Sequence, residues 1–290
     1  MRVVKAAGRN SYRLHEARAE GDRRSHMKLD HAMRQALISG RFRLHYQPQV
    51  SLVDGRVVGA EALLRWRDPE WGEMSPALFI PVAEESGFIV AIGDWVLSQA
   101  VRQIALWQQR GRALPVAINV SALQFQQAQF VDRVAGVLAV SGVQPDLLEL
   151  ELTESILVHD ADDALARLQA LARLGVRLSI DDFGTGYSSL AYLKRFPIGK
   201  LKIDKSFVQG LPADDSDAAI VRAILQMARA LGMKVIAEGV ETPEQRQFLH
   251  DGGCDEFQGF VFAPALDTLS FEQRVPMGAP STPRFRLVGG

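Results

Sequence analysis

Residues 177–190 read Arg177-Leu178-Ser179-Ile180-Asp181-Asp182-Phe183-Gly184-Thr185-Gly186-Tyr187-Ser188-Ser189-Leu190, an apolar strand that ends in two aspartates and a Gly-x-Gly loop. Burying a carboxylate without a partner is very costly, so paired aspartates at a strand end indicate a shared cation. Neighbouring strand residues point to opposite faces, and both acids can serve one site only if the chain turns there. Gly184 and Gly186 provide that turn, because glycine tolerates backbone angles that other residues avoid.

The composition is that of a globular protein with a large core, since 47% of the 290 residues are hydrophobic. A formal net charge of −1 gives no overall field toward polymeric nucleic acid or an anionic membrane. The single cysteine, Cys254, excludes an internal disulfide and suits a reducing compartment. No apolar run reaches the length of a membrane span, and the N-terminus lacks an apolar signal core. We expect a cytoplasmic protein with no membrane segment in this stretch; an anchor elsewhere in a longer parent protein stays open.

Predicted strands and helices alternate along the sequence on both sides of residues 177–190. This alternation predicts parallel strands joined by crossover helices, and eight such strands favour an α/β fold of the (β/α)8 TIM-barrel type over an open sheet. Asp54-Gly55 indicates a tight turn between the first two strands, so we expect the first strand to be antiparallel. The expected strands are 43–52, 57–66, 114–120, 147–153, 176–182, 199–204, 234–239 and 256–262. The expected helices are 27–38, 76–85, 93–110, 126–141, 162–174, 188–195, 216–231 and 243–251.

Helix starts and chain ends carry their own signals. Ser75 and Thr242 each place a hydroxyl before a proline at the first helical position, and Thr242 with Gln245 fits a capping box. Residues 1–26 are polar and rich in arginine, which is typical of a linker. Residues 273–290, with prolines and terminal glycines, are typical of a flexible tail. The barrel domain is therefore expected at 27–272.

Acidic side chains gather where the predicted strands end, which in barrels is the edge that carries the chemistry. The acids outnumber the bases there, and such an excess repels itself unless cations bind. Oxygen ligands of this kind suit Mg²⁺ or Mn²⁺, and their number favours two metal ions, an arrangement suited to displacement at phosphorus. Arg65 would then bind a phosphate oxygen and Lys202 would orient the attacking water. The candidate metal ligands are Glu61, Asn119, Glu151, Asp181, Asp182 and Glu238.

Several of these residues have a simpler structural interpretation when taken singly. Asn119 could satisfy backbone groups, and Asp204 could cap a helix or pair with Lys202. Glu149 shares a strand face with Glu151 and has no assigned role; an ion pair with Lys200 is the simplest explanation. The structural interpretation fails for the whole set, because it needs a coincidence at each of six strand ends.

Together these segments resemble the EAL-domain family of cyclic-di-GMP phosphodiesterases, over about residues 28–270. The matching motifs, in the family's order and spacing, are Tyr46-Gln47-Pro48, Glu61-Ala62-Leu63-Leu64-Arg65-Trp66, Ile118-Asn119-Val120-Ser121, Glu151-Leu152-Thr153-Glu154-Ser155, the stretch from Asp181 to Leu190, Leu201-Lys202-Ile203-Asp204, Ala237-Glu238-Gly239-Val240-Glu241 and Gln258-Gly259-Phe260.

The resemblance implies metal-dependent hydrolysis of one phosphodiester bond of cyclic-di-GMP, giving the linear dinucleotide pGpG. It implies two divalent cations, Mg²⁺ or Mn²⁺, with inhibition by Ca²⁺. Lys202, Glu238 and Glu61 match catalytic positions, and the metal ligands match the six residues named above. Glu154 matches a residue that holds the loop after the fifth strand, and Glu241 an acid behind the metal site. The positions that match substrate contacts are Gln47, Arg65, Asp204 and Gln258.

The resemblance leaves one alternative function open, and the sequence departs from the family's usual pattern at two places. Degenerate members of the family are inactive sensors that bind cyclic-di-GMP; loss of a ligand would favour that function, and none is lost here. Phe260 stands where the family usually has tyrosine, and the segment that follows, up to Leu266, lacks a common basic residue. A homodimer is implied by the family. Residues 8–13 resemble the end of a GGDEF domain, which implies upstream GGDEF or sensory domains in a longer parent chain.

Overall fold

The structure is a computed structural model that describes residues 25–157, 161–184 and 193–275. The chain divides into two compact units. Unit 1 comprises Met1–Arg43 and Leu64–Ile92, and unit 2 comprises Leu44–Leu63 and Gly93–Gly290. The expected linker, the expected tail and the helix expected at 188–195 fall largely outside the described residues, so they stay predictions.

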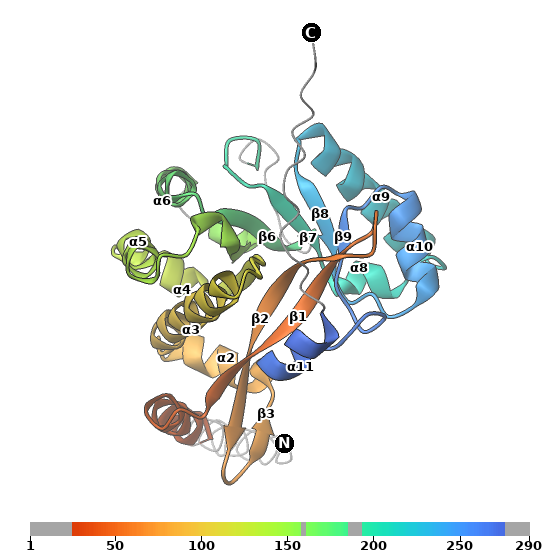
Figure 1. The fold of residues 1–290 in the computed structure, drawn as a ribbon. Coiled ribbons are helices and arrows are strands. Elements are labelled where there is room, and N and C mark those ends of the chain that lie inside the picture. The colour runs from red at the N-terminus through yellow and green to blue at the C-terminus, as the bar shows by residue number, and fades with distance from the viewer. Residues whose placement is uncertain (1–24, 158–160, 185–192, 276–290) are drawn as a thin grey trace, which may run out of the picture. The chain divides into compact units, whose positions relative to one another are not determined.

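One sheet forms the centre of the fold (Figure 1), and its strand order is β1-β9-β8-β7-β6-β5-β4-β2-β3 with a further β1–β2 pairing that closes a barrel. β1 runs antiparallel to β9, whereas β2 and β4 to β9 pair in parallel. The predicted TIM-type barrel with an antiparallel first strand is confirmed. The strands are β1 Phe42–Ser51, β2 Val57–Asp68, β3 Gly72–Met74, β4 Val116–Val120, β5 Leu148–Thr153, β6 Arg177–Phe183, β7 Lys200–Ile203, β8 Lys234–Ala237 and β9 Glu256–Phe257.

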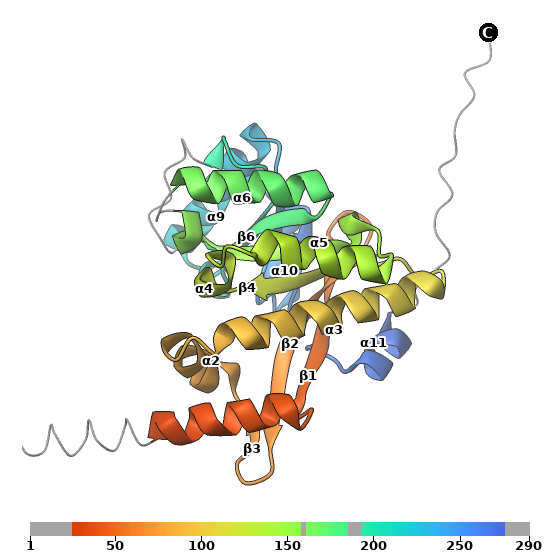
Figure 2. The ribbon, with the colours of Figure 1, turned by 90° about the vertical axis from the view of Figure 1, so that its left-hand side faces the viewer.

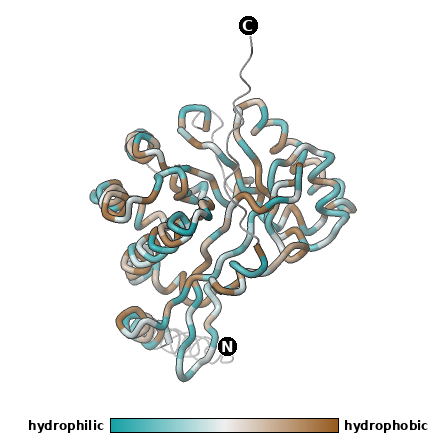
Figure 3. Tube along the Cα trace, viewed as in Figure 1, coloured by the Kyte–Doolittle hydropathy of each residue, from teal (hydrophilic) through white to brown (hydrophobic). Residues whose placement is uncertain are grey.

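Hydrophilic and hydrophobic residues alternate along the helices (Figure 3), as in helices with one buried face. α9 buries Val221, Ile224, Leu225 and Ala228 on one face. α5 and α6 lie side by side (Figure 2). The described α-helices are residues 25–38, α2 Pro76–Glu85, α3 Ile89–Gln109, α4 Ala122–Phe125, α5 Phe130–Ser141, α6 Ala161–Leu174, α8 Lys205–Gln209, α9 Asp215–Ala230, α10 Pro243–Asp251 and α11 Thr268–Arg274; two short 3₁₀ turns are Pro145–Leu147 and Glu154–Leu157.

The capping predictions have opposite outcomes. Thr242 and Gln245 form the expected capping box at the start of α10. Ser75 precedes Pro76 as expected, but its side chain makes no capping hydrogen bond, so that prediction is wrong. The short elements β3, α8 and α11 were not expected, because segments of three to seven residues carry too little periodicity to be recognised.

Contrary to the expectation that no apolar run reaches the length of a membrane span, helix α3 has that length and composition, with a mean hydropathy of 1.2. Of its most apolar window, 44% is buried inside the structure. Its inward positions, among them Val96, Leu97, Ala100 and Ile104, are buried, as in the core helix of a globular protein.

Unit 1 has its own aromatic core. The rings of Phe42, Trp66 and Phe79 lie with centroids 5.3–6.1 Å apart, and all three side chains are buried. The Arg34 guanidinium covers the ring of Phe88 at 4.5 Å. These contacts give unit 1 a packed interior that includes the helix at 25–38.

A buried ion-pair cluster fills the barrel where strands β5 and β7 begin. Lys200 Nζ lies 3.1 Å from Glu149 Oε2 and 2.9 Å from Glu256 Oε2. Burial lowers the pKa of Lys200, but the two carboxylates outweigh it and hold the pKa above its ordinary value. The ion pair expected between Glu149 and Lys200 is therefore confirmed, and Glu256 is a third member that the sequence did not reveal.

Replacing Lys200 with methionine is expected to lower the free energy of unfolding by about 3–5 kcal/mol, because Glu149 would be left as a buried carboxylate without a cation and Glu256 would keep only the exposed Lys234. Urea unfolding measures this. Lys234→Met is the matched control: Lys234 is 65% exposed and lies 3.6 Å from the same Glu256, so its loss should cost no more than about 1 kcal/mol. Equal losses for the two variants would contradict the buried-cluster interpretation.

Candidate functional site

The two adjacent aspartates of β6 reach one site because the strand itself is irregular. The register of β6 against β7 shifts between Ile180 and Phe183. Asp182 adopts a left-handed backbone conformation with φ of 53°, and Gly184 follows with φ of 99°. A non-glycine residue in this region costs about 1–3 kcal/mol and is typical of functional sites. The turn therefore begins at Asp182, two residues before Gly184, the first of the two glycines that predicted it; Gly186 lies outside the described residues.

Lys202 occupies the centre of the acidic cluster in unit 2. Its Nζ lies 2.6 Å from Glu151 Oε2, 2.6 Å from Glu238 Oε1, 3.0 Å from Asp181 Oδ1 and 3.8 Å from Glu61 Oε2. The side chain of Lys202 is 1% exposed. Strands β2, β5, β6 and β7 and the residue after β8 supply these groups, so the barrel brings together side chains from five separate strand ends.

Amide side chains complete the cluster around Glu61. Asn119 Nδ2 donates to Glu61 Oε1 at 2.7 Å, and Gln258 Nε2 donates to Glu61 Oε2. The second N–H of Gln258 meets Gln47 Oε1 at 3.2 Å, and Gln47 Nε2 donates to the Ala263 carbonyl at 3.2 Å. Both oxygens of Glu61 thus have an amide donor, and Gln47 reaches Glu61 only through Gln258.

The pKa values reflect burial and mutual repulsion of the acids. Burial raises the pKa of Glu151 and of Glu238, against the opposing attraction of Lys202. Burial, and then the charges of Asp181 and Asp204, raise the pKa of Asp182 to about 6. Burial lowers the pKa of Lys202, but Glu151 and Glu238 outweigh this and raise it well above its ordinary value. With their raised pKa values, Glu151, Asp182 and Glu238 therefore hold protons more tightly than ordinary carboxyl groups.

The remaining predicted site residues make contacts of their own outside the Lys202 cluster. Asp204 caps α8, accepting from the N–H of Ser206 at 3.0 Å, and its side chain also bonds to Asp182. Glu154 Oε2 accepts from the Gly184 N–H at 3.4 Å, at the start of the loop it is predicted to hold. Glu241 is exposed just before α10. Arg65 belongs to unit 1, where its Nη1 donates to the Leu64 carbonyl at 2.8 Å.

The donor set fits divalent cations. Among the described residues, no group of three or more His, Cys, Asp or Glu side chains is placed so as to hold a metal ion directly, and the Lys202 ammonium lies among the acids. Four carboxyl groups lie within 4 Å of this one ammonium, and Glu151 Oε1 is buried without a hydrogen-bond partner. Such oxygen ligands suit Mg²⁺ or Mn²⁺. Glu61, Asn119, Glu151, Asp181, Asp182 and Glu238 could hold them.

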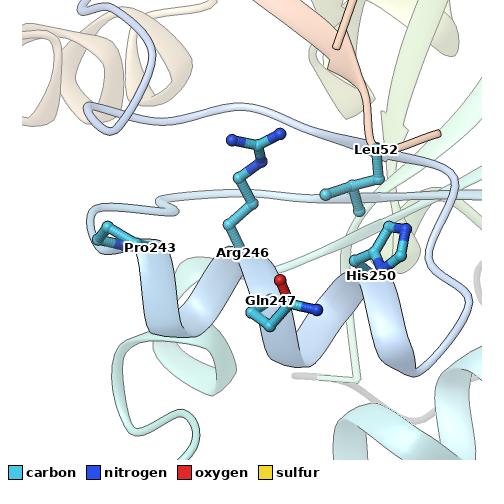
Figure 4. Close-up of a pocket in the computed structure, with 5 residues that line it drawn as sticks. All are labelled: Leu52, Pro243, Arg246, Gln247 and His250. Carbon is cyan, nitrogen blue, oxygen red and sulfur yellow. The ribbon is translucent and has the colours of Figure 1, made fainter. Parts of the chain in front are cut away.

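A separate hollow of about 280 Å³ lies between Leu52 and one face of α10, lined by Pro243, Arg246, Gln247 and His250 (Figure 4). None of the predicted site residues lines it. Sequence reasoning missed one feature of the site itself, the chain of hydrogen bonds from Glu61 through Gln258 to Gln47. The helix cap by Asp204, given above as a simpler interpretation of that residue, is confirmed.

Comparison with known proteins places these features in one family. The profile of the family described as EAL domain matches residues 30–265. The chain is 48% identical over 259 residues to the bifunctional diguanylate cyclase/cyclic di-GMP phosphodiesterase MucR of Pseudomonas aeruginosa, covering 89% of this chain and 38% of that relative. It is 42% identical over 245 residues to the cyclic di-GMP phosphodiesterase PdeR of Escherichia coli, covering 84% of this chain and 37% of that relative.

Solved structures agree with the sequence relatives. The c-di-GMP complex of the PaMucR phosphodiesterase has a TM-score of 0.82 and 47% sequence identity, covering 84% of this chain and 99% of that chain. The chain spans less than two fifths of the length of the two curated relatives, which are longer proteins. The profile match, the barrel with its antiparallel first strand and the acidic rim agree, and the chain belongs to the EAL domain family.

Proposed function

We propose that the protein hydrolyses one phosphodiester bond of cyclic-di-GMP to give linear pGpG. The observation that carries this proposal is the set of four carboxylates, from Glu61, Glu151, Asp181 and Glu238, that converge on Lys202. The relatives named as cyclic di-GMP phosphodiesterases, and the related structure holding c-di-GMP, support the choice of substrate. A cytoplasmic location and a homodimer stay expectations, as do upstream domains in a longer parent chain.

The residues of the site suit a displacement at phosphorus. Two bound divalent cations would supply charge neutralisation at the phosphate and a water of lowered pKa. Glu61, Asn119, Glu151, Asp181, Asp182 and Glu238 would hold them at the rim. Lys202, already fixed between Glu151 and Glu238, would donate a hydrogen bond to the attacking water and orient it. The water oxygen forms a new bond to phosphorus while one ester bond of the ring breaks.

The alternative is a sensor that binds cyclic-di-GMP without cleaving it. Chromatography of cyclic-di-GMP incubated with the protein and Mg²⁺ separates the two functions. We expect the substrate peak to be replaced by pGpG. Substrate that is bound in equilibrium dialysis but never converted would establish the sensor and exclude the enzyme.

Replacing Arg65 with alanine is expected to weaken binding of cyclic-di-GMP by about 10–100-fold, because a charge-assisted hydrogen bond to phosphate contributes about 1.5–3 kcal/mol. Lys202→Ala should weaken binding less than Arg65→Ala does. Titration calorimetry in Ca²⁺, which should suppress turnover, measures the dissociation constant. Arg67→Ala is the control: Arg67 lies on the same strand with its side chain 76% exposed, and its removal should leave affinity unchanged. Unchanged affinity of the Arg65 variant would exclude the phosphate role.

A further inference from the structure

Helix α11 lies beyond the part of the chain that the family profile matches, which ends at residue 265. It nevertheless packs back on the barrel beside β1 (Figures 1 and 2). Phe271 is fully buried, stacked on Trp107 of α3 at 5.3 Å and edge-on to Tyr46 of β1 at 6.0 Å. Glu272 Oε1 accepts from Trp107 Nε1 at 2.8 Å and from Arg110 Nη1 at 3.0 Å. An aromatic contact and a polar contact thus fix the helix.

The fixed helix holds the segment that precedes it. Arg274 Nη2 donates to the Phe262 carbonyl at 3.2 Å, and its guanidinium lies 5.6 Å from the centre of the Phe262 ring. Four residues further on, Leu266 exchanges two backbone hydrogen bonds with Tyr46, at 2.7 and 3.0 Å. The backbone between these points, including the carbonyl of Ala263, is therefore held by Arg274 of α11 at one end and by Tyr46 of β1 at the other.

The Ala263 carbonyl begins a chain of amide hydrogen bonds that ends on Glu61. A carboxylate only accepts, so Gln258 must turn its NH₂ group toward Glu61. Its other N–H then meets Gln47 Oε1, which leaves Gln47 Nε2 to donate to the Ala263 carbonyl. Gln47 and Gln258 are 9% and 4% exposed, so water does not easily replace these partners. The direction of every hydrogen bond in the chain is fixed by the two acceptors at its ends.

We propose that α11 is a positioning element of the metal site, acting through the 262–266 segment and the Gln47–Gln258 relay on the carboxylate of Glu61. This proposal rests on the proposed function, because it takes Glu61 as a metal ligand. Partners behind a ligand that orient it typically change metal affinity by about 10–100-fold when lost. Gln258 is the direct partner of Glu61, whereas Arg274 acts on it only through the backbone at Phe262 and Ala263 and through Gln47, so its effect should be smaller.

Binding of Mn²⁺ by calorimetry, without substrate, tests the proposal independently of turnover. Gln47→Met should weaken Mn²⁺ binding by about 10-fold, as for loss of a group that supports a ligand. Arg274→Ala should weaken it about threefold in the wild-type background and not at all in the Gln47→Met background, since the relay is then already broken. Arg274 is exposed at the helix end, so this variant should fold; Arg274→Gln gives the same test with less loss of packing.

Arg222→Ala is the matched control. Arg222 also covers an aromatic ring, Phe248, at 5.0 Å, but it has no connection to Glu61. It should lower stability as Arg274→Ala does and leave Mn²⁺ affinity unchanged. If Arg274→Ala leaves Mn²⁺ affinity unchanged, or weakens it equally in both backgrounds, the proposal is wrong while the proposed function stands. If the wild-type protein binds no Mn²⁺, the metal-dependent function fails, and this proposal with it.

Discussion

Asp181→Asn is expected to reduce turnover of cyclic-di-GMP by more than about 100-fold, because it removes a proposed metal ligand. Loss of a group that only supports a ligand typically costs about 10–100-fold, so loss of the ligand itself should cost more. Asp181 Oδ1 lies 3.0 Å from Lys202 Nζ at the centre of the acidic cluster. The amide keeps the shape of the side chain but lacks the negative charge that attracts a cation. Glu61→Ala should abolish turnover in the same way. The rate of pGpG formation at saturating Mg²⁺ measures both.

Stability distinguishes loss of function from loss of fold. Asp181 raises the pKa of Asp182 by repulsion, so in EDTA the Asp181→Asn protein should melt at a temperature no lower than the wild type. Asp132→Asn, which changes an exposed acid of α5, is the control and should leave both turnover and melting temperature unchanged. If Asp181→Asn kept activity within threefold of the wild type, Asp181 would not be a ligand.

Removal of divalent ions with a chelator is expected to abolish turnover, and Mg²⁺ or Mn²⁺ should restore it. Ca²⁺ should inhibit, because its larger and more flexible coordination shell suits a two-metal displacement poorly. The site without ions is built around Lys202, which neutralises only part of the surrounding charge. Turnover that survives complete chelation would contradict the proposed mechanism.

The affinity for Mg²⁺ should rise with pH between about 6 and 8. Burial raises the pKa values of Glu151 and Glu238, and burial with repulsion raises that of Asp182 to about 6. An ion must displace these protons, and fewer remain to be displaced at higher pH. Calorimetric titrations of Mg²⁺ at three pH values, with proton release measured in two buffers, check the direction.

The raised pKa values also mean that the metal-free protein binds more protons when folded than when unfolded. Its free energy of unfolding should therefore fall as pH rises through these pKa values.

The sequence alone determined the barrel and most of the acidic rim. Long amphipathic segments such as Asp215–Ala230 have a clear periodicity, and this reveals the helix before any contact is known. The strand ends of a barrel meet at one rim, so Glu61, Glu151 and Asp181 could be placed together from their positions in the predicted strands. The ion pair of Glu149 with Lys200 followed in the same way, because both alternate with site residues two positions further on.

Only the tertiary structure decided how these side chains pair. Lys202 could have faced any of the acids, and its place among Glu151, Glu238 and Asp181 depends on the closure and register of the barrel. The turn at Asp182 arises from a register shift against β7, which depends on pairing between strands and not on local sequence. The short helix α11 and its link to Glu61 through Gln47 join residues more than 200 positions apart. Periodicity reports which face of an element is buried, whereas such contacts are fixed by long-range packing, and this is why the sequence could not predict them.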